Sequence, residues 1–216
     1  MCFVYFSTMY WFIIIIPGAY LLGSIPTSVW LGKAIKGVDL REHGSGNAGA
    51  TNAFRVLGKP IGSVVLLLDM LKGFLAVNLA LLQHEIAPDT EAWMILKIGL
   101  GLLAVLGHIF PVFAGFRGGK GVATITGVAL AIHPFAALAA MGVYLLVFLL
   151  TRISAMGSLT AVLTYPVWII WVFQSEYLTI RIFSLLVVVL VLITHRSNIL
   201  RLARGEEKSL FRKQGT

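Results

Sequence analysis

Long apolar runs, separated by short polar segments, are the feature that most restricts the fold of this chain. Six runs cover about residues 10–31, 61–82, 93–114, 122–151, 157–173 and 177–194. Each reaches the roughly 17–25 residues that an α-helix needs to cross a bilayer. Only 12% of the residues are charged and the mean hydropathy is +0.92, whereas soluble domains carry about 25% charged residues. We therefore expect an all-α, polytopic membrane protein.

The chain shows no sign of a separate soluble domain. Its longest polar stretch, residues 33–60, is too short for a hydrophobic core of its own, so we treat residues 1–216 as one integral membrane domain. The N-terminus lacks the positive segment of a signal peptide, which predicts that run 10–31 is a retained first helix. The single cysteine, Cys2, rules out an internal disulfide and a cysteine zinc cluster.

The distribution of charge predicts the orientation. Basic residues collect in segments 33–59, 117–120 and 196–213, and acidic residues in segments 83–91 and 174–176. Segments rich in lysine and arginine stay in the cytoplasm. Run 122–151, with His133-Pro134 near its middle, is either one kinked helix or two shorter helices. All basic segments share one side only if it turns at Pro134, which predicts seven transmembrane helices, N-terminus outside and C-terminus inside. The segment before Pro134 is short for a full span, so a half-depth or re-entrant helix is the alternative there.

Three charged residues, Asp69, Lys72 and Lys97, lie inside the apolar runs. A charge at the bilayer centre costs about 2.5–3.5 kcal/mol on insertion scales, so such residues face the protein interior or a water-filled path. Asp69 and Lys72 are three residues apart, on one face of a helix, and can pair. The pair belongs either to a proton or ion path or to the structural interior of the bundle. We favour the structural reading, because a path usually needs more than one such pair.

The first of three polar segments on the predicted cytoplasmic side runs from Ser45 to Asn52 and is followed by Arg55. Its small residues allow backbone N–H groups to approach an anion closely, and its polar side chains add neutral donors. Arg55 adds a guanidinium that suits phosphate. The pattern fits a phosphate-binding loop and a flexible turn between helices equally well.

The second segment covers residues 107–121. Pro111 can end the third helix, and the glycines that follow open the next helix, whose N-terminus would favour an anion. Lys120 adds a mobile positive charge. The segment is not a Walker A loop, because Gly121 stands where that loop has serine or threonine. We favour anion binding over the alternative, a glycine turn with two topogenic charges.

The third segment follows the last apolar run. On a helix, His195, Asn198 and Arg201 share a face, which brings an imidazole, an amide and a guanidinium to the membrane surface. Alone, the segment is more typical of a basic juxtamembrane helix that fixes orientation. Together with Arg55 and Lys120, it predicts a site for more than one anion. This site and the topology explain the net charge of +8 better than nucleic-acid binding does.

These three segments, and the stretch Asp69-Met70-Leu71-Lys72-Gly73, resemble the signature motifs of the bacterial acyl-phosphate-dependent glycerol-3-phosphate acyltransferase family. The resemblance covers nearly the whole chain. It implies a seven-helix enzyme of the bacterial inner membrane, with its active site on the cytoplasmic face. The implied reaction moves a fatty acyl group from acyl phosphate to the 1-hydroxyl of glycerol 3-phosphate. Lysophosphatidic acid and phosphate result, for phospholipid biosynthesis. The implied partners are these substrates and membrane lipid, without cofactor, metal or nucleic acid.

The motif positions carry over the candidate site residues. The catalytic candidates are Ser45, Arg55, Lys120, His195 and Asn198. The substrate-binding candidates are Asn47, Gly49, Thr51, Asn52, Gly118, Gly119, Gly121, Ser158 and Arg201. Ser158 matches its motif loosely, and Glu206 matches an acid for which we expect a structural role.

Acyl phosphate is already activated, because phosphate leaves readily, so the protein mainly has to align two anionic substrates and stabilise developing charge. The proton of the attacking hydroxyl can go to His195 or to the departing phosphate. We expect the phosphate to take it, because no cytoplasmic carboxylate is obviously paired with His195.

Two other functions fit parts of the sequence. A membrane transporter of phosphorylated metabolites would explain the helices and the anion site, but it needs an outer gate, and the predicted outer loops lack glycine-rich donors. The segment from His84 to Asp89 fits the H-x4-D pattern of a CoA-dependent acyltransferase family. That segment lies in a loop predicted outside, away from every phosphate-binding candidate. The histidines also lack the H-E-x-x-H spacing of a zinc site.

Overall fold

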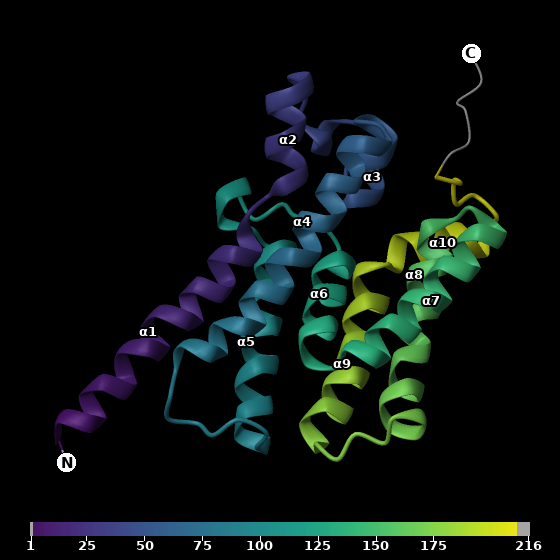
Figure 1. Ribbon diagram of the computed structural model, residues 1–216. Coiled ribbons are helices and arrows are strands. Elements are labelled where there is room, and N and C mark those ends of the chain that lie inside the picture. Colours follow the sequence, from purple (N-terminus) through teal and green to yellow (C-terminus); the bar gives the residue numbers. More distant parts are fainter. Residues whose placement is uncertain (1, 211–216) are drawn as a thin grey trace.

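The computed structural model describes residues 2–210, with side chains from Tyr10 onward, and all regular elements in this range are helical (Figure 1). The all-α prediction is thus confirmed. The end of the predicted cytoplasmic tail, with Arg212 and Lys213, lies outside the described residues, as does the side chain of Cys2.

Ten α-helices follow one another along the described chain. They are α1 (Cys2–Ser24), α2 (Thr27–Lys36), α3 (Ala50–Val56), α4 (Lys59–Asn78), α5 (Glu91–Ile109), α6 (Val122–Ile132), α7 (Pro134–Thr151), α8 (Ser154–Val167), α9 (Leu178–Thr194) and α10 (Arg196–Ala203). Shorter turns are η1 (Leu40–Glu42), η2 (Leu79–Leu82), η3 (Val112–Ala114) and the π-helical η4 (Trp168–Val172).

Several segments have the length and composition of membrane spans. In the described part of the chain, four qualify singly: Lys59–Leu82, Glu91–Ala114, Pro134–Thr151 and Ser154–Val172. Two bent pairs, α1 with α2 and α9 with α10, bring the number to six if each pair counts as one span. Helix α6 has only 11 residues. At 1.5 Å per residue it covers about 17 Å, roughly half of a 30 Å hydrocarbon core.

The first apolar run is not the single continuous helix that we predicted. Helix α1 ends at Ser24 and α2 begins at Thr27, with a bend of 44° between them. Pro26 causes the break, because proline has no backbone N–H and disfavours helical geometry in the residue before it. The carbonyl of Ile25 accepts a hydrogen bond from Lys72 Nζ at 3.0 Å.

The fourth run does turn at His133-Pro134. His133 caps the start of α7 by accepting a hydrogen bond from the Ala136 N–H at 3.3 Å. Lys97 in α5 donates to the carbonyl of Ala131 at 3.0 Å, which satisfies a backbone group where α6 stops inside the bundle. The two-helix alternative is therefore the observed one, and Lys97 has a structural partner.

The helices form two groups, which meet where α6 packs against α7 and α5 against α9. Helix α4 packs against α6, α1 against α5, and α7 against α8, and Figure 1 shows α1, α4, α5 and α6 beside α7, α8 and α9. At Gly127 the backbones of α4 and α6 approach so closely that a Cβ would lie 1.8 Å from the Met70 carbonyl oxygen. Small residues at such contacts are common in membrane helix pairs. Helices α2, α3 and α10 lie at one end of the bundle (Figure 1), and the site lies there.

Candidate active site

A cavity of about 280 Å³ begins among the loops at this end and continues between α6, α7, α8 and α9. Polar residues line its mouth: Ser45, Asn47, Thr51, Arg55, Lys120, His195, Asn198, Arg201 and Glu207. Small or apolar residues line its interior: Ala129, Ala137, Ala140, Ala161, Val162, Tyr165 and Val187. Along α8, the lining extends from Ser154 to Tyr165, a depth of about 16 Å at 1.5 Å per residue. One cavity therefore joins a polar mouth to an apolar interior.

Hydrogen bonds from Asn52 hold the loop that carries Ser45. The amide nitrogen of Asn52 donates to the carbonyls of Leu40 and His43 at 2.9 and 3.0 Å, and its oxygen accepts from the Ser45 N–H at 2.9 Å. Asn52 is 1% exposed, and its amide nitrogen and oxygen both bond to the backbone of this loop. Asn52 therefore holds Ser45 at the cavity.

Three hydroxyl groups connect α3 with α7 and α8 along the cavity wall. Thr51 Oγ1 lies 3.1 Å from Ser154 Oγ, which lies 3.1 Å from the hydroxyl of Tyr144. Ser158 lines the cavity one helical turn beyond Ser154. Sequence reasoning found Thr51 and Ser158 but missed Ser154 and Tyr144, since Tyr144 lies in an apolar run and Ser154 in no motif.

Lys120 lies directly before α6. Gly121 caps this helix with φ of 86°, a left-handed conformation that glycine adopts without strain. The N–H groups of the first turn of α6 lack partners within the helix, which favours an anion there. Lys120 Nζ donates a hydrogen bond to Asn198 Oδ1. Burial, and then the nearby charge of Arg201, lower the pKa of Lys120 to about 8.

Gly118 and Gly119 do not line this cavity. The Gly118 N–H donates to the Ile109 carbonyl at 3.2 Å, and the Gly119 N–H donates to the His108 carbonyl at 3.1 Å. These bonds fix the loop against the end of α5. In this arrangement the two glycines hold Lys120 in place and do not themselves reach the site.

His195 and Asn198 are buried at the junction of α9 and α10. His195 Nδ1 lies 3.1 Å from the Val191 carbonyl oxygen, so this nitrogen carries the proton of the neutral ring. Burial, and then the charge of Lys120, lower the pKa of His195 to about 4. The predicted alignment of His195, Asn198 and Arg201 is observed, because all three line the cavity.

Glu207 is the acid of the mouth. It accepts hydrogen bonds from Asn198 Nδ2 at 3.0 Å and from Arg201 Nε at 2.6 Å. Sequence reasoning chose its neighbour Glu206, whose backbone N–H donates to the Arg201 carbonyl at 2.8 Å and whose side chain is exposed. Two adjacent glutamates offer no sequence signal that distinguishes them.

Positive charge dominates the mouth. Arg55 donates to the Lys208 carbonyl at 3.0 Å, and burial is the main cause that lowers its pKa. Arg55, Lys120 and Arg201 face a single carboxylate, Glu207, among the residues that line the cavity mouth. The mouth is therefore suited to anions.

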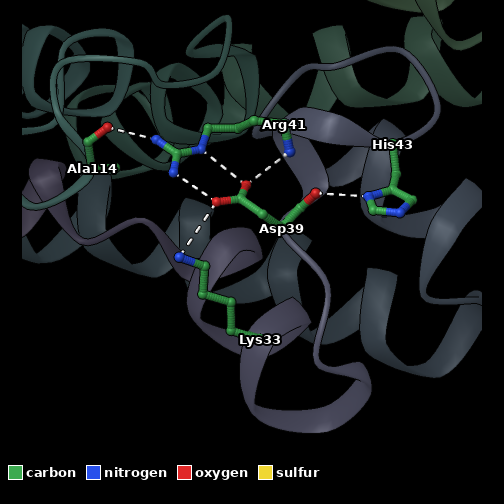
Figure 2. Close-up of polar contacts among 5 residues, drawn as sticks. All are labelled: Lys33, Asp39, Arg41, His43 and Ala114. Carbon is green, nitrogen blue, oxygen red and sulfur yellow. Dashed lines mark hydrogen bonds and ion pairs between the residues drawn. The ribbon is translucent and has the colours of Figure 1, made fainter.

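Outside the cavity, an Asp39–Arg41 ion pair at η1 is connected to the second polar segment through Arg41 (Figure 2). The Asp39 carboxylate accepts from Arg41 Nε and Nη2 at 2.9 and 2.7 Å, and Lys33 Nζ lies 3.4 Å away. Arg41 Nη1 also donates to the carbonyl of Ala114 at 2.7 Å. Hydrogen bonds from Arg41 keep the pKa of Asp39 well below its usual value, so this connection persists at neutral pH.

The cavity therefore collects twelve of the fourteen sequence-predicted site residues, all except Gly118 and Gly119. They are Ser45, Asn47, Gly49, Thr51, Asn52, Arg55, Lys120, Gly121, Ser158, His195, Asn198 and Arg201. In the described part of the chain, no three histidine, cysteine, aspartate or glutamate side chains are arranged to hold a metal ion.

Comparison with known proteins gives one consistent result. A family model described as glycerol-3-phosphate acyltransferase matches residues 13–205. A glycerol-3-phosphate acyltransferase of Myxococcus xanthus is 48% identical over 194 residues, covering 88% of this chain and 94% of the relative. One of Thermosynechococcus vestitus is 42% identical over 200 residues, covering 91% and 94%.

Two solved structures are also similar. Both are crystal structures of PlsY, an integral membrane glycerol 3-phosphate acyltransferase, in a glycerol 3-phosphate form and a lysophosphatidic acid form. They superpose with TM-scores of 0.81 and 0.79 at 40% and 38% identity, covering 91% of this chain and 94% of theirs. The chain is thus an integral membrane protein, and it belongs to the glycerol-3-phosphate acyltransferase family.

Proposed function

We propose that this glycerol-3-phosphate acyltransferase takes its acyl group from acyl phosphate and transfers it to the 1-hydroxyl of glycerol 3-phosphate. The observation that carries the proposal is the cavity itself, which joins a basic mouth to an apolar interior. An acyl phosphate has the same two parts, a charged headgroup and an apolar chain. The related structures in glycerol 3-phosphate and lysophosphatidic acid forms support the acceptor and the product.

Each part of the mouth has a task in this reaction. Lys120 and the first turn of α6 bind the phosphate of glycerol 3-phosphate, and Ser45 and Arg55 hold the phosphate of the donor. Asn198 fixes Lys120 through a hydrogen bond. The acyl chain lies in the interior beside Ala161, so its carbonyl carbon meets the acceptor hydroxyl at the mouth. Alignment of two bound reactants supplies much of the rate enhancement.

The chemical step needs only the bound substrates and these residues. The 1-hydroxyl oxygen bonds to the acyl carbon, and the bond from that carbon to the phosphate oxygen breaks. The phosphate departs with the electron pair and takes the hydroxyl proton. His195 orients the reactants, because a histidine with a pKa of about 4 is a poor general base at neutral pH.

The orientation that we propose has seven crossings, with α6 as a short one, and the mouth in the bacterial cytoplasm. The polar loops around the mouth carry basic residues such as Lys33, Lys36 and Arg117, which favours the cytoplasmic side. The connection between η2 and α5, with Glu85 and Asp89, lies at the other end of the bundle (Figure 1).

A donor comparison tests the reaction. Purified protein in detergent receives glycerol 3-phosphate together with one of three acyl donors in parallel reactions. The donors are acyl phosphate, acyl-CoA and acylated acyl carrier protein, all with the same acyl chain. We expect lysophosphatidic acid from acyl phosphate only. Comparable turnover with either other donor contradicts the proposed donor, and absence of product with all three contradicts the proposed reaction.

Cysteine labelling tests the orientation. In a Cys2→Ser background, Glu42→Cys and Ala87→Cys place exposed thiols at the two ends of the bundle. We expect an impermeant reagent to label Ala87→Cys in intact cells and Glu42→Cys only after lysis. The reverse pattern contradicts the orientation.

A transporter of phosphorylated metabolites is the alternative, and the structure offers little for it. At the end opposite the mouth, Thr179 of α9 donates two hydrogen bonds to the Glu91 carboxylate of α5. Just before these helices, the Tyr177 hydroxyl donates to the Asp89 carbonyl at 2.9 Å. Uptake of labelled glycerol 3-phosphate into proteoliposomes without a donor would revive this alternative.

A further inference from the structure

A buried polar cluster lies behind the glycine loop, inside the bundle. Asp69 Oδ1 lies 2.8 Å from Lys72 Nζ and 3.7 Å from His108 Nδ1, and it accepts a hydrogen bond from the Thr27 hydroxyl. Asp69, Lys72 and His108 are 1%, 5% and 6% exposed. The pairing of Asp69 with Lys72 confirms the prediction from their spacing. The involvement of His108, from the second polar segment, was not predicted.

His108 connects this cluster to the loop that carries Lys120. Its carbonyl accepts the Gly119 N–H at 3.1 Å, and its ring packs so closely on the loop that a Cβ at Gly119 would lie 2.2 Å from Nε2. Asp69 faces the other nitrogen of the same ring. The loop is therefore held by both the backbone and the ring of His108, and Lys120 is the next residue after Gly119.

A simple structural ion pair does not explain this arrangement. Replacing a buried pair by apolar residues of similar volume is often neutral or stabilising, so a structural need alone is a weak reason for charges inside a membrane. Asp69 Oδ2 has no hydrogen-bond partner in the described structure, and both Asp69 and His108 reach the wall of the main cavity. The cluster touches the site directly.

We propose that Asp69 and His108 are positioning residues for the acyltransferase reaction. Asp69 fixes the His108 ring, His108 fixes Gly119, and the loop then presents Lys120 to the phosphate of glycerol 3-phosphate. The inference rests on the proposed function, because it assigns Lys120 to this acceptor. It predicts that substitutions in the cluster raise the KM for glycerol 3-phosphate even where the protein stays folded.

A double-mutant cycle separates positioning from charge balance. Asp69→Asn leaves the buried Lys72 ammonium without its counter-ion, so we expect a lower Tm. Asp69→Asn combined with Lys72→Met removes both charges, and we expect its Tm to recover. The KM for glycerol 3-phosphate should nevertheless stay raised by on the order of tenfold, while the KM for the acyl donor changes little. His108→Phe, which keeps a ring and both charges, should show the same change in KM.

Lys97→Met is the matched control. Lys97 is another lysine in a membrane helix, but it donates to Ala131 and lies about 16 Å from His108 along α5. We expect a lower Tm with an unchanged KM for glycerol 3-phosphate. A double variant with the wild-type KM would overturn the proposal, and so would a His108→Phe variant with that KM.

Calorimetric binding of glycerol 3-phosphate to the same variants keeps this inference separate from the proposed function. Wild-type protein that neither binds this ligand nor forms product contradicts the proposed function. Wild-type protein that binds it, with equal binding by His108→Phe and the double variant, contradicts the positioning role alone. Binding weakened in these two variants and unchanged in Lys97→Met supports it.

Discussion

The mouth and the interior of the cavity differ in charge and in the kind of side chain that lines them. At the mouth, Arg55, Lys120 and Arg201 face one carboxylate, and hydrogen bonds fix the side chains. In the interior, small residues such as Ala137 and Ala161 leave a space with mostly apolar walls. Under the proposed function, the mouth therefore selects substrates by charge, and the interior selects acyl chains by shape.

This difference also divides the expected energetic effects. Charged contacts in a partly dry site are strong, and losing one costs about 1.5–3 kcal/mol. Apolar contacts in a pocket contribute about 1–3 kcal/mol per methylene for discrimination between ligands, but a chain that fits poorly can still react. Substitutions at the mouth should reduce turnover with acyl phosphates of every chain length, whereas substitutions in the interior should change which chain length is preferred.

Lys120→Ala is expected to have the largest effect. The variant removes a cation that Asn198 holds at the start of α6. We expect a loss of at least about 2 kcal/mol of transition-state binding, or about 30-fold in kcat/KM, equal for short and long donors. The assay is steady-state kinetics with two acyl phosphates. A near-normal kcat/KM would show that the charge of Lys120 serves topology only.

The pH dependence of the reaction gives the next effect. The pKa of Lys120, about 8 in the free protein, is lowered mainly by burial, so its charge is lost as the pH rises through 8. The value of kcat/KM for glycerol 3-phosphate reports the free enzyme and should fall above pH 8 by close to tenfold per unit.

Lys120→Arg sharpens this test, because a guanidinium stays charged in proteins. The level of activity can change, since arginine and lysine differ in shape, so the form of the profile is compared and not its height. The alkaline fall should vanish or move well above pH 9. A fall that stays near pH 8 in the variant would assign it to another group.

The sequence predicted the mouth far better than the interior. Motif residues with distinctive chemistry, such as Ser45, Lys120 and Asn198, all reach the cavity. Polar side chains beside apolar runs avoid lipid, so they face either water or a polar site. Alanines and valines of the interior look the same as residues that face lipid. The sequence did not point to Tyr144 because it lies within an apolar run, nor to Ser154 because it lies in no motif.

Other differences arise from geometry that the pattern does not contain. Run 10–31 reads as continuous, yet Pro26 breaks it, and a proline-based reading could have placed that break. Glu207, and not Glu206, bonds to Asn198 and Arg201 because the chain turns at Gly205, which has φ of 68°. Gly118 and Gly119 read as phosphate ligands, but their N–H groups bond to the end of α5.

Ala161→Leu tests selection by shape in the interior. The added methylenes would enter the space about 10 Å beyond Ser154 along α8. We expect kcat/KM for long acyl phosphates to fall by about tenfold relative to short ones, measured by competition between two chain lengths. Val167→Leu, which enlarges an exposed residue on the same helix, should leave the ratio unchanged. An equal loss for both lengths would show that the chain lies elsewhere.

His195→Gln should have the smallest effect, although histidine is the residue that most often acts as a general base. Its Nδ1 faces the Val191 carbonyl at 3.1 Å, and its pKa of about 4, lowered first by burial, keeps the ring neutral at pH 7. A ring of this kind orients a phosphate or a hydroxyl through Nε2, and a glutamine amide can do much the same. A general base contributes about 10²–10⁴-fold, so retention of at least about a tenth of kcat would exclude that role. The acid limb of the pH–rate profile should also persist in the variant. If turnover is abolished while glycerol 3-phosphate still binds, and the acid limb disappears, His195 accepts the proton and the departing phosphate does not.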